Sequence, residues 1–477
     1  MLLMLSLFSC SKEEAAVDTV VYVKTITLSG SNITTGNTGQ ITAETLPSNA
    51  TNKTVSWKSS DTTIAEISSS GLLTAKKNGN VIITATATDK NTVTATKEIT
   101  ISSFSNGQTF DYTVSTSAEL LVALAKVKAG ETIALNGGTY TMNSKITVSV
   151  SGTANNKISL IGLTNSSRPI LDFSAMAENG SNQGIVLSAN YWYIKGIDIY
   201  KAGDNGMQIK GSNNVIEFCT FSECKDTGLQ IDNGASNNTI LNCDSYFNAD
   251  AALENADGFA CKLNAGTGNK FVGCRAWQNL DDGWDGYLRG TDNITTTYQN
   301  CWAVKNGYLK TGVKGAGDGN GFKTGGSDDK LLKHNATYTN CVAVGNVADG
   351  FDHNSNRGVV TIYNCSAYSN GVNYSFSNTN PLAQLIIKNS NVLGSFGSTN
   401  ATLLDVTNNS WQNGLVVTAA DFKSLDFQQL LAARKADGSL PDINFFYLNA
   451  DSKMIDKGID VGLAFKGSAP DLGAFEY

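Results

Sequence analysis

Residues 299–304 read QNCWAV, residues 339–344 read TNCVAV and residues 363–368 read YNCSAY. In each stretch a strand-like run ends in Asn-Cys, and a second short run follows. Similar strand-and-cysteine copies surround Cys219, Cys243 and Cys274. A motif repeated along a chain indicates a solenoid, in which each copy forms one coil. We therefore predict a stacked-coil parallel β-helix over roughly residues 180–395, within an all-β protein.

The cysteines of these copies are predicted to be buried and unpaired. Eight of the nine cysteines fall in this region, so a disulfide framework is the rival interpretation. They recur at one repeat position, and stacked coils would place their sulfur atoms in a column of small apolar fillers. Ser390 and Ile197 take that position in weaker copies at either end. No proline lies between Pro169 and Pro381, as expected where every strand is central in a sheet.

The composition is that of a folded, weakly acidic protein. Hydrophobic residues make up 41% of the 477 residues and charged residues only 16%, which leaves enough apolar material for a sizeable core. The net charge of -7 offers no basic surface, so we expect no nucleic-acid partner. We expect the protein to be a monomer.

The N-terminus resembles the export signal of a bacterial lipoprotein. Leu2 to Phe8 form an apolar run too short to span a bilayer, and the run leads into Ser9 and Cys10. The resemblance implies lipidation of Cys10, and the following Ser11-Lys12-Glu13-Glu14 is similar to the acidic export signal of surface lipoproteins. We expect a cell-surface or outer-membrane lipoprotein whose only membrane contact is this anchor. An ordinary cleaved signal peptide is the alternative.

Residues 18–103 alternate short strands, such as Lys24–Leu28, with turns rich in Gly, Asn and Ser. Pro47, Trp57 and the run at residues 71–75 form a pattern that resembles the bacterial immunoglobulin-like domain, group 2. The resemblance implies a β-sandwich with Trp57 as a core aromatic residue. We expect this domain to act as a spacer, with glycan binding as the alternative.

The order of the segments follows from these signals. Thr116 to Glu119 fit a capping box that opens a helix from Ala118 to Val127, and this helix would cover an open sheet edge. A second short helix is expected near Ala420–Arg434. The expected segments are a signal peptide and tether at 1–17, the Ig-like domain at 18–103, the N-terminal cap and first coils at 104–180, the β-helix core at 181–399, and the C-terminal coils and cap at 400–477.

A second repeated position follows each cysteine, and it is a turn in which glycine precedes an apolar residue. Asp or Asn before Gly is ordinary turn chemistry, so most copies are interpreted as turns alone. The copies are Asn205-Gly206-Met207, Thr227-Gly228-Leu229, Asp257-Gly258-Phe259, Asp282-Gly283-Trp284, Asn320-Gly321-Phe322 and Asp349-Gly350-Phe351.

The middle copies are unusually acidic, because Asp281, Asp282 and Asp285 fall within five residues. Adjacent coils lie about 4.8 Å apart, so Asp257 should lie one coil before Asp282, and Lys323 one coil after Asp285. Carboxylates this close repel one another unless a cation lies among them, and oxygen-only ligation suits Ca²⁺ better than a transition metal. A solvated acidic turn paired with Lys323 is an equal alternative from spacing alone.

Residues 105–477 resemble polysaccharide lyase family 9, whose known activities include pectate and rhamnogalacturonan lyases. The motifs that carry the resemblance are NADGF at 255–259, NLDDGWD at 279–285, GNGFK at 319–323 and PDLGAFE at 470–476. The resemblance implies a right-handed parallel β-helix, a bound Ca²⁺ ion and a lysine as the catalytic base. The implied base is Lys323, and the implied Ca²⁺ ligands are Asp257, Asp281, Asp282 and Asp285.

The implied reaction is β-elimination from a pectic uronate backbone, either polygalacturonate or rhamnogalacturonan. A base removes the C5 proton, the C4–O bond breaks, and a cation stabilises the developing charge. A lysine beside a cation should have a lowered pKa, and activity should rise toward alkaline pH. A pectin hydrolase on the same fold and a catalytically silent surface glycan-binding protein are the alternatives.

The contacts with a polyanionic substrate are predicted to come from basic side chains along the β-helix. For each of them a solvated surface charge is an equal alternative. Trp284 and Tyr287 either stack on sugar rings or pack in the protein. The basic candidates are Lys225, Lys262, Arg289 and Arg357.

Overall fold

The structure is a computed structural model that describes residues 20–33, 37–76, 79–90, 92–101, 110–163 and 168–477. The chain divides into two compact units, residues 1–109 and residues 110–477. Cys10 and the expected lipoprotein signal lie outside the described residues. Within the described part of the chain, no helix is both long and apolar enough to cross a membrane.

The first unit consists of small antiparallel sheets around an apolar core. Leu73, Ile83 and Ile99 are fully buried there, and the half-buried Trp57 packs against them. The strands are β1 (Thr25–Ser29) paired with β3 (Thr42–Leu46); β2 (Thr38–Gln40), β6 (Leu72–Ala75) and β5 (Ala65–Ile67); and β4 (Val55–Ser59), β7 (Gly79–Ala87) and β8 (Thr94–Ile101).

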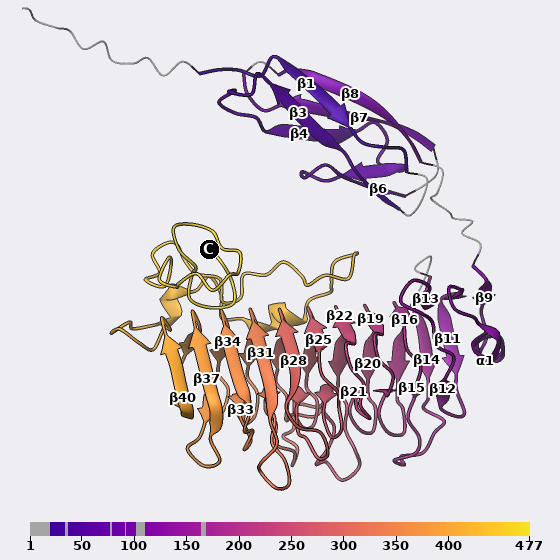
Figure 1. The fold of residues 1–477 in the computed structure, drawn as a ribbon, viewed down its shortest axis with the longest axis vertical. Helices are drawn as coiled ribbons and strands as arrows, with labels where there is room; N and C mark the ends of the chain where they lie inside the picture. Colours follow the sequence, from indigo (N-terminus) through magenta and orange to yellow (C-terminus); the bar gives the residue numbers. More distant parts are fainter. Residues whose placement is uncertain (1–19, 34–36, 77–78, 91, 102–109, 164–167) are drawn as a thin grey trace, which may run out of the picture. The chain divides into compact units, whose positions relative to one another are not determined.

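The second unit is a parallel β-helix in which each coil adds one strand to each of three sheets (Figure 1). The first sheet contains β9 (Tyr112–Val114), β10 (Thr132–Leu135), β13 (Ile158–Gly162), β16 (Trp192–Lys195), β19 (Val215–Glu217), β22 (Thr239–Leu241), β25 (Asn269–Val272), β28 (Ile294–Gln299), β31 (His334–Thr339), β34 (Val359–Tyr363), β37 (Leu382–Lys388) and β40 (Ala401–Thr407).

The two other sheets contain ten strands each. The second sheet contains β11 (Gly138–Thr141), β14 (Pro169–Asp172), β17 (Asp198–Tyr200), β20 (Thr220–Ser222), β23 (Asp244–Tyr246), β26 (Arg275–Trp277), β29 (Trp302–Val304), β32 (Val342–Val344), β35 (Ser366–Tyr368) and β38 (Asn391–Leu393). The third sheet contains β12 (Ile146–Val148), β15 (Ile185–Leu187), β18 (Met207–Ile209), β21 (Leu229–Ile231), β24 (Phe259–Cys261), β27 (Trp284–Asp285), β30 (Phe322–Lys323), β33 (Asp349–Asp352), β36 (Val372–Phe376) and β39 (Gly397–Thr399).

The corner between the first and second sheets explains the Asn-Cys pairs. Asn300, Asn340 and Asn364 have φ angles of 53°, 52° and 50°, in the left-handed region that asparagine tolerates better than most residues. This conformation bends the chain from one sheet into the next, and the following cysteine turns into the core. Cys219 donates its backbone N–H to the Cys243 sulfur at 3.4 Å. Every cysteine in the described part is buried and unpaired, which confirms the predicted column and excludes the disulfide framework there.

The corner between the second and third sheets contains a ladder of buried asparagines, which the sequence analysis did not identify. Asn279 donates its side-chain N–H to Asn306 Oδ1 at 3.0 Å, and Asn306 donates in turn to Asn346 at 2.9 Å. At the start of the ladder Asn248 donates to Asn279 Oδ1 at 2.8 Å, and further along Asn346 donates to Asn370 Oδ1 at 2.8 Å. Each amide therefore joins two neighbouring coils.

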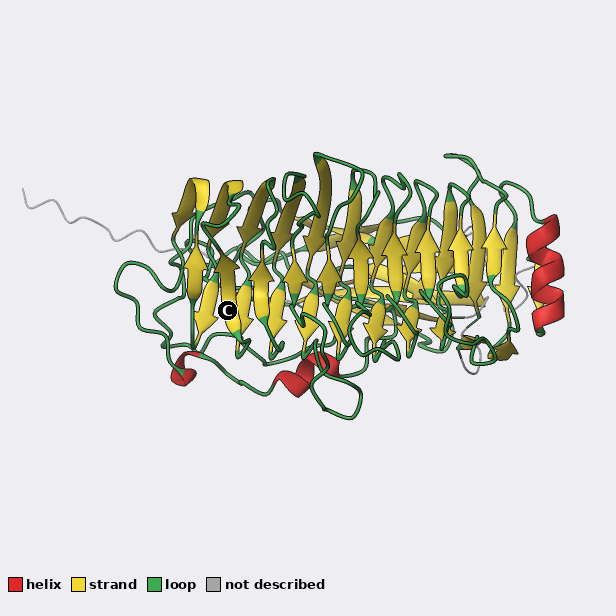
Figure 2. Ribbon diagram, turned by 90° about the horizontal axis from the view of Figure 1, so that it is seen from below, coloured by secondary structure: helices red, strands yellow, loops and turns green. Residues whose placement is uncertain are grey.

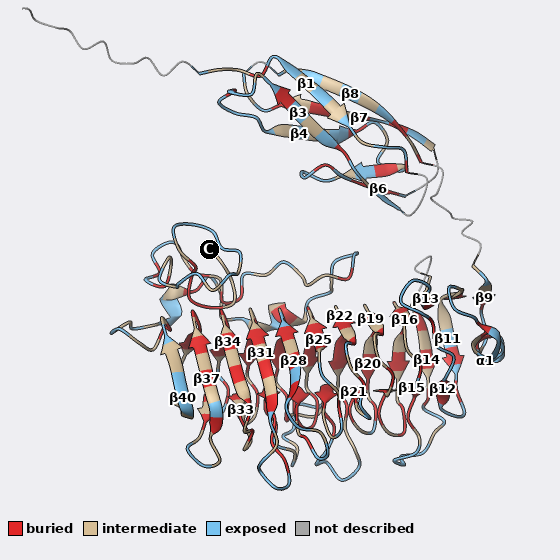
Figure 3. Ribbon diagram, in the orientation of Figure 1, coloured by how far each residue is buried: buried red, intermediate tan, exposed pale blue. Residues whose placement is uncertain are grey.

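The interior is filled by columns of stacked aromatic rings. Phe259, Trp284, Phe322 and Phe351 lie one above another, with ring-centre distances of 5.2, 4.8 and 5.0 Å. Trp284 is only 1% exposed, so it packs in the core and is not available to stack on a sugar. Burial alternates along strands such as β31, as Figure 3 shows by its bands. Inward side chains thus hold the coils in register.

The two ends of the β-helix are treated differently. The helix α1 (Ser117–Lys126) covers the N-terminal end of the stack, as Figure 2 shows, and Thr116 and Glu119 form the predicted capping box. In the segment after β40, the short helix expected near Ala420–Arg434 is replaced by two separate turns of 3-10 helix. The segment contains the short 3-10 helices η1 (Ala419–Asp421) and η2 (Phe427–Leu431) and runs back along the outside of the second sheet (Figure 1).

A buried ion network attaches this C-terminal segment to the coils. Arg434 and Arg275 each contact the Asp244 carboxylate at 2.7 Å. Arg275 also donates to the backbone oxygens of Leu430 and Ala432. Phe422 and Phe445 cover Trp302 and the neighbouring valines of the second sheet. The segment therefore shields the flank of the β-helix beside its C-terminal coils.

Candidate active site

The acidic motifs meet at the corner between the second and third sheets, on three successive coils. Asp257 precedes β24, Asp281 and Asp282 precede β27, and Asp285 ends β27. The register pairs Trp284 with Phe322 and Asp285 with Lys323, as the spacing predicted. All five functional candidates therefore lie just before or within short strands of the third sheet, where the chain has just crossed the corner.

Backbone N–H groups fix the carboxylates one coil apart. Asp257 Oδ1 accepts the N–H of Asp282 at 3.2 Å, and Asp282 Oδ1 accepts the N–H of Asn320 at 2.8 Å. One carboxylate oxygen from each of Asp257, Asp281 and Asp282 lies within 4.8 Å of the other two. The three side chains are at most 7% exposed. They form a compact buried acidic cluster.

These backbone hydrogen bonds leave one carboxylate oxygen of the acidic cluster without a hydrogen-bond donor. Asp282 Oδ2 is buried and accepts no hydrogen bond from the described residues. Lys323 Nζ lies 3.2 Å from it as an ion pair only. A buried anionic oxygen without a hydrogen-bond donor is costly, and a hard cation bound by oxygen ligands would remove that cost. The donor set therefore fits Ca²⁺ in chemistry and spacing.

Asp285 shares a second lysine with Asp257. Lys262 Nζ is 2.6 Å from Asp257 Oδ2 and 3.3 Å from Asp285 Oδ2. Lys262, one of the predicted substrate contacts, has its ammonium group between these two carboxylates. The structure thus brings one oxygen each of Asp257, Asp281 and Asp282 within 4.8 Å of one another, and Lys262 links Asp285 to Asp257 in the same site.

The electrostatics of the acidic cluster favour neutralisation. Burial, and then the charge of Asp257, raise the pKa of Asp281 to about 7. Burial raises the pKa of Asp257 as well, and burial together with Asp281 raises that of Asp282 far above its usual value. Burial acts in the same direction on Asp285, but Lys323 and Lys262 outweigh it and lower the pKa of that carboxyl.

Lys323 is almost completely buried between carboxylates. Its Nζ lies 2.9 Å from Asp318 Oδ2 and 3.2 Å from Asp282 Oδ2. Burial alone lowers the pKa of Lys323, but Asp282, Asp285 and other nearby aspartates outweigh burial and hold the pKa well above its usual value. The sequence predicts a lowered pKa for Lys323 beside a cation, but the protein residues without a cation raise this pKa. Their uncompensated negative charge keeps Lys323 protonated.

Asp318 is a site residue that the sequence analysis missed. Besides its contact with Lys323, it donates its backbone N–H to Asp281 Oδ1 at 2.5 Å. Its side chain is 63% exposed, so it meets both solvent and the site. The sequence feature that could have identified Asp318 is its position as the one acidic residue in the glycine-rich stretch 315–321, just before Lys323.

The remaining substrate candidates are spread over the surface. Lys225 lies 4.0 Å from Glu178, Arg289 lies 3.6 Å from Asp328, and Arg357 is half-buried. Tyr287 donates its hydroxyl to Asp328 at 2.6 Å, and Lys323 Nζ lies 5.9 Å from the centre of its ring. Tyr287 is thus a wall of the site, unlike the core residue Trp284.

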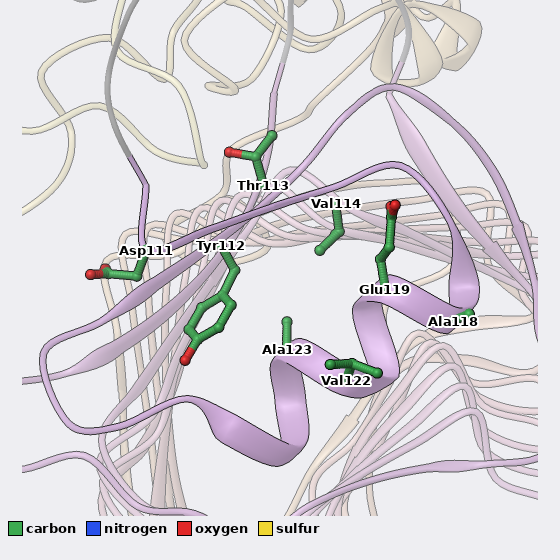
Figure 4. A pocket seen from close by; sticks show the side chains of 8 residues that line it. All are labelled: Asp111, Tyr112, Thr113, Val114, Ala118, Glu119, Val122 and Ala123. Atoms are coloured by element: carbon green, nitrogen blue, oxygen red, sulfur yellow. The ribbon is translucent and has the colours of Figure 1, made fainter.

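A separate pocket lies at the N-terminal end of the β-helix, between β9 and α1 (Figure 4). The two carboxylates in this pocket accept hydrogen bonds from nearby backbone N–H groups. Asp111 accepts the N–H of Thr132, and Glu119 caps the helix through the N–H groups of Ser115 and Thr116. This pocket therefore contributes no group to the acidic corner.

The fold and the corner together define a class of molecule, a parallel β-helix protein with a buried acidic site and a lysine beside it. The family description "Pel9A-like, right handed beta helix region" matches residues 100–391, and "Bacterial Ig-like domain (group 2)" matches residues 22–101. The chain belongs to this Pel9A-like β-helix family, and it is a polysaccharide lyase. The resemblance to polysaccharide lyase family 9, the Ig-like domain and the right-handed β-helix are thereby confirmed.

Named relatives and solved structures agree with this assignment. Pectate lyase L of Dickeya dadantii is 39% identical over 387 residues, which cover 78% of this chain and 88% of the relative. Pectate lyase PEL9 of Emericella nidulans is 32% identical over 372 residues, covering 71% and 89%. The crystal structure of pectate lyase Pel9A matches with a TM-score of 0.70 at 35% identity, covering 78% of this chain and 97% of that one. A structure titled rhamnogalacturonan lyase gives 0.63 at 29% identity, covering 70% and 92%.

Proposed function

We propose that the protein is a Ca²⁺-dependent lyase that cleaves the uronate backbone of pectic polysaccharide by β-elimination, with Lys323 as the base. One observation carries the proposal. The Lys323 ammonium group directly contacts a carboxylate of the only described cluster whose oxygens could jointly hold a metal ion. A base and a cation site therefore share one corner of the β-helix.

Asp257, Asp281 and Asp282, together with Asp285 as the family resemblance implies, would hold the cation. When bound, Ca²⁺ would supply positive charge that pairs with the uronate carboxylate and stabilises the charge that develops beside C5. Asp285 is buried and ion-paired with Lys262, so its negative charge lies inside the same site. The relatives named pectate lyase support polygalacturonate as the first substrate to test, and rhamnogalacturonan as the second.

Lys323 acts on the substrate proton. In its neutral form, Nζ accepts the C5 proton, which lies α to the C6 carboxylate, and the electron pair left at C5 forms the C4–C5 double bond as the C4–O bond breaks. Burial favours the neutral amine, whereas the surrounding aspartates oppose it. Once the charge of these carboxylates is compensated, burial prevails and the pKa of Lys323 falls. Activity should therefore increase toward alkaline pH.

The test is to incubate the purified protein with polygalacturonate or rhamnogalacturonan, with Ca²⁺ or with EDTA. The unsaturated product is followed by its ultraviolet absorbance. We expect absorbance to rise with Ca²⁺ and to remain flat in EDTA. A lack of product from both polymers would refute the lyase proposal, whereas full activity in EDTA would refute only the cation assignment.

We also propose that the protein is anchored at the cell surface through a lipid on Cys10, with the Ig-like domain as a spacer. This proposal is supported by the apolar run from Leu2 to Phe8 and the acidic residues that follow Cys10. Labelling cells with a radioactive fatty acid should mark the protein, and Cys10→Ser should abolish the label. Equal labelling of both proteins would refute the anchor.

A further inference from the structure

A groove continues the acidic corner toward the N-terminal end of the β-helix. Lys201, Glu223, Phe247 and Gln278 each follow a strand of the second sheet, and their φ angles are 55°, 55°, 60° and 48°. They are equivalent residues on four successive coils, so their side chains form a row at the corner that holds the acidic site. The first three of them line a groove with a volume of about 440 Å³.

A short hairpin links this groove to Lys323. Leu309 donates its N–H to the oxygen of Val313 at 2.8 Å to form the hairpin, and Gln278 donates to the oxygen of Leu309 at 3.1 Å. Lys310, at the turn, reaches back to Glu223 at 2.6 Å. The same loop continues to Asp318, which contacts both Asp281 and Lys323. One loop thus lines the groove at one end and the acidic site at the other.

The groove offers the groups that a uronate chain requires. Lys201, Lys225 and Lys310 line it, and their side chains are 41%, 45% and 57% exposed. Lys310 Nζ lies 5.3 Å from the centre of the Phe247 ring, so an apolar face lies beside the positive charge. The counter-ions are glutamates in partly exposed pairs, which are weak and can be exchanged for the carboxylates of a polyanion.

We propose that this groove binds the polyuronate chain several sugars away from the bond that is cleaved, with carboxylates on Lys225 and Lys310 and a pyranose face on Phe247. The identity of the ligand rests on the proposed lyase function. Lys225 precedes β21 and Lys323 lies in β30, three coils later, or about 14 Å at the usual strand spacing. Only a chain of several linked sugars spans that distance, so the groove selects for long substrates.

The test compares the double variant Lys225→Met/Lys310→Met with the unmodified protein on polygalacturonate and on trigalacturonate. Lys195→Met is the matched control, because Lys195 is 40% exposed and pairs with Glu217 at 2.7 Å on the first sheet. We expect the KM for the polymer to rise about 25-fold, at about fivefold for each lysine, with kcat unchanged. The KM for trigalacturonate should change less than twofold. An unchanged KM for the polymer would overturn the proposal.

A binding measurement separates this proposal from the lyase proposal. Migration of the Lys323→Ala protein through a native gel that contains polygalacturonate measures binding without turnover. Loss of retardation when the two groove lysines are also replaced supports the groove, whether or not the unmodified protein forms product. Equal retardation with and without the groove lysines overturns the groove and leaves the lyase proposal standing. Absence of any retardation also overturns the groove, and absence of product in the separate assay overturns the lyase function.

Discussion

The two corners that flank the second sheet use the same backbone bend but opposite chemistry. Between the first and second sheets, a left-handed residue is followed by a buried cysteine, as at Asn300 and Cys301. Between the second and third sheets, a left-handed residue is followed by a buried asparagine, as at Lys305 and Asn306. The first corner is closed and apolar, whereas the second carries every carboxylate of the candidate active site.

The difference follows from the chain segment that comes directly after each corner, which is a strand at one corner and a loop at the other. At the cysteine corner the next strand starts at once, so the ladder bonds continue and a small apolar side chain suffices. At the asparagine corner loops of varied length are inserted, such as the one between β29 and β30. Buried backbone groups beside these loops need partners, and the amides supply them. A corner that is already lined by polar groups can hold carboxylates at the spacing of the coils.

The largest effect is expected from removing Lys323 at the polar corner. Lys323→Ala should lower kcat on polygalacturonate by about 10³-fold or more, because a positioned general base contributes roughly 10²–10⁴-fold. Steady-state kinetics by ultraviolet absorbance give the value. Lys388→Ala is the matched control, since Lys388 is ion-paired with Asp405 at 2.8 Å and only 21% exposed. A similar loss in both variants would refute the base assignment.

The same contrast explains what could be predicted from the sequence. The cysteines recur in six coils, so Cys301 and its equivalents revealed the fold. The asparagines also recur, five residues after the cysteine at Asn306 and Asn346, but asparagine is common in turns and its ladder was not recognised. The register of Asp285 on Lys323 followed from coil spacing. The pairing of Lys262 with both Asp257 and Asp285 depends on side-chain positions, and coil spacing does not encode that.

The next effect concerns pH and the cation. The pKa of Asp281 is raised from 3.8 to about 7, mainly by burial, so the folded protein retains a proton that the unfolded chain releases. Without a bound cation, the free energy of unfolding should therefore fall as the pH rises from about 4 to about 7, and titration of Asp281 should account for up to about 4 kcal/mol of this loss. Urea unfolding in EDTA at pH 5 and pH 8 measures the part of this loss that falls above pH 5, about 3 kcal/mol, and Ca²⁺ should restore stability at pH 8. Asp281→Asn should show a smaller pH dependence, and an identical dependence would contradict the assignment.

Breaking the asparagine ladder should cost somewhat less. Asn306 is fully buried, and its side chain bonds to Asn279, Asn346 and the oxygen of Ala276. Asn306→Ala leaves these buried groups unsatisfied and should lower the free energy of unfolding by about 3 kcal/mol. Asn378→Ala, at an exposed surface position, should cost about 0.5 kcal/mol or less. Urea unfolding at constant Ca²⁺ measures both, and equal costs would contradict a structural role for the ladder.

The smallest effect is expected at the cysteine corner. Cys301→Ser should lower the free energy of unfolding by about 1 kcal/mol, because only a small apolar group is exchanged and a hydroxyl can find partners at this bend. Ser390, at the equivalent position, accepts the N–H of Cys365 at 3.2 Å and donates to the oxygen of Lys388 at 3.3 Å. A cost as large as that of Asn306→Ala would show that the thiols do more than fill space. Since the change leaves the polar corner intact, kcat and Ca²⁺ dependence should not change.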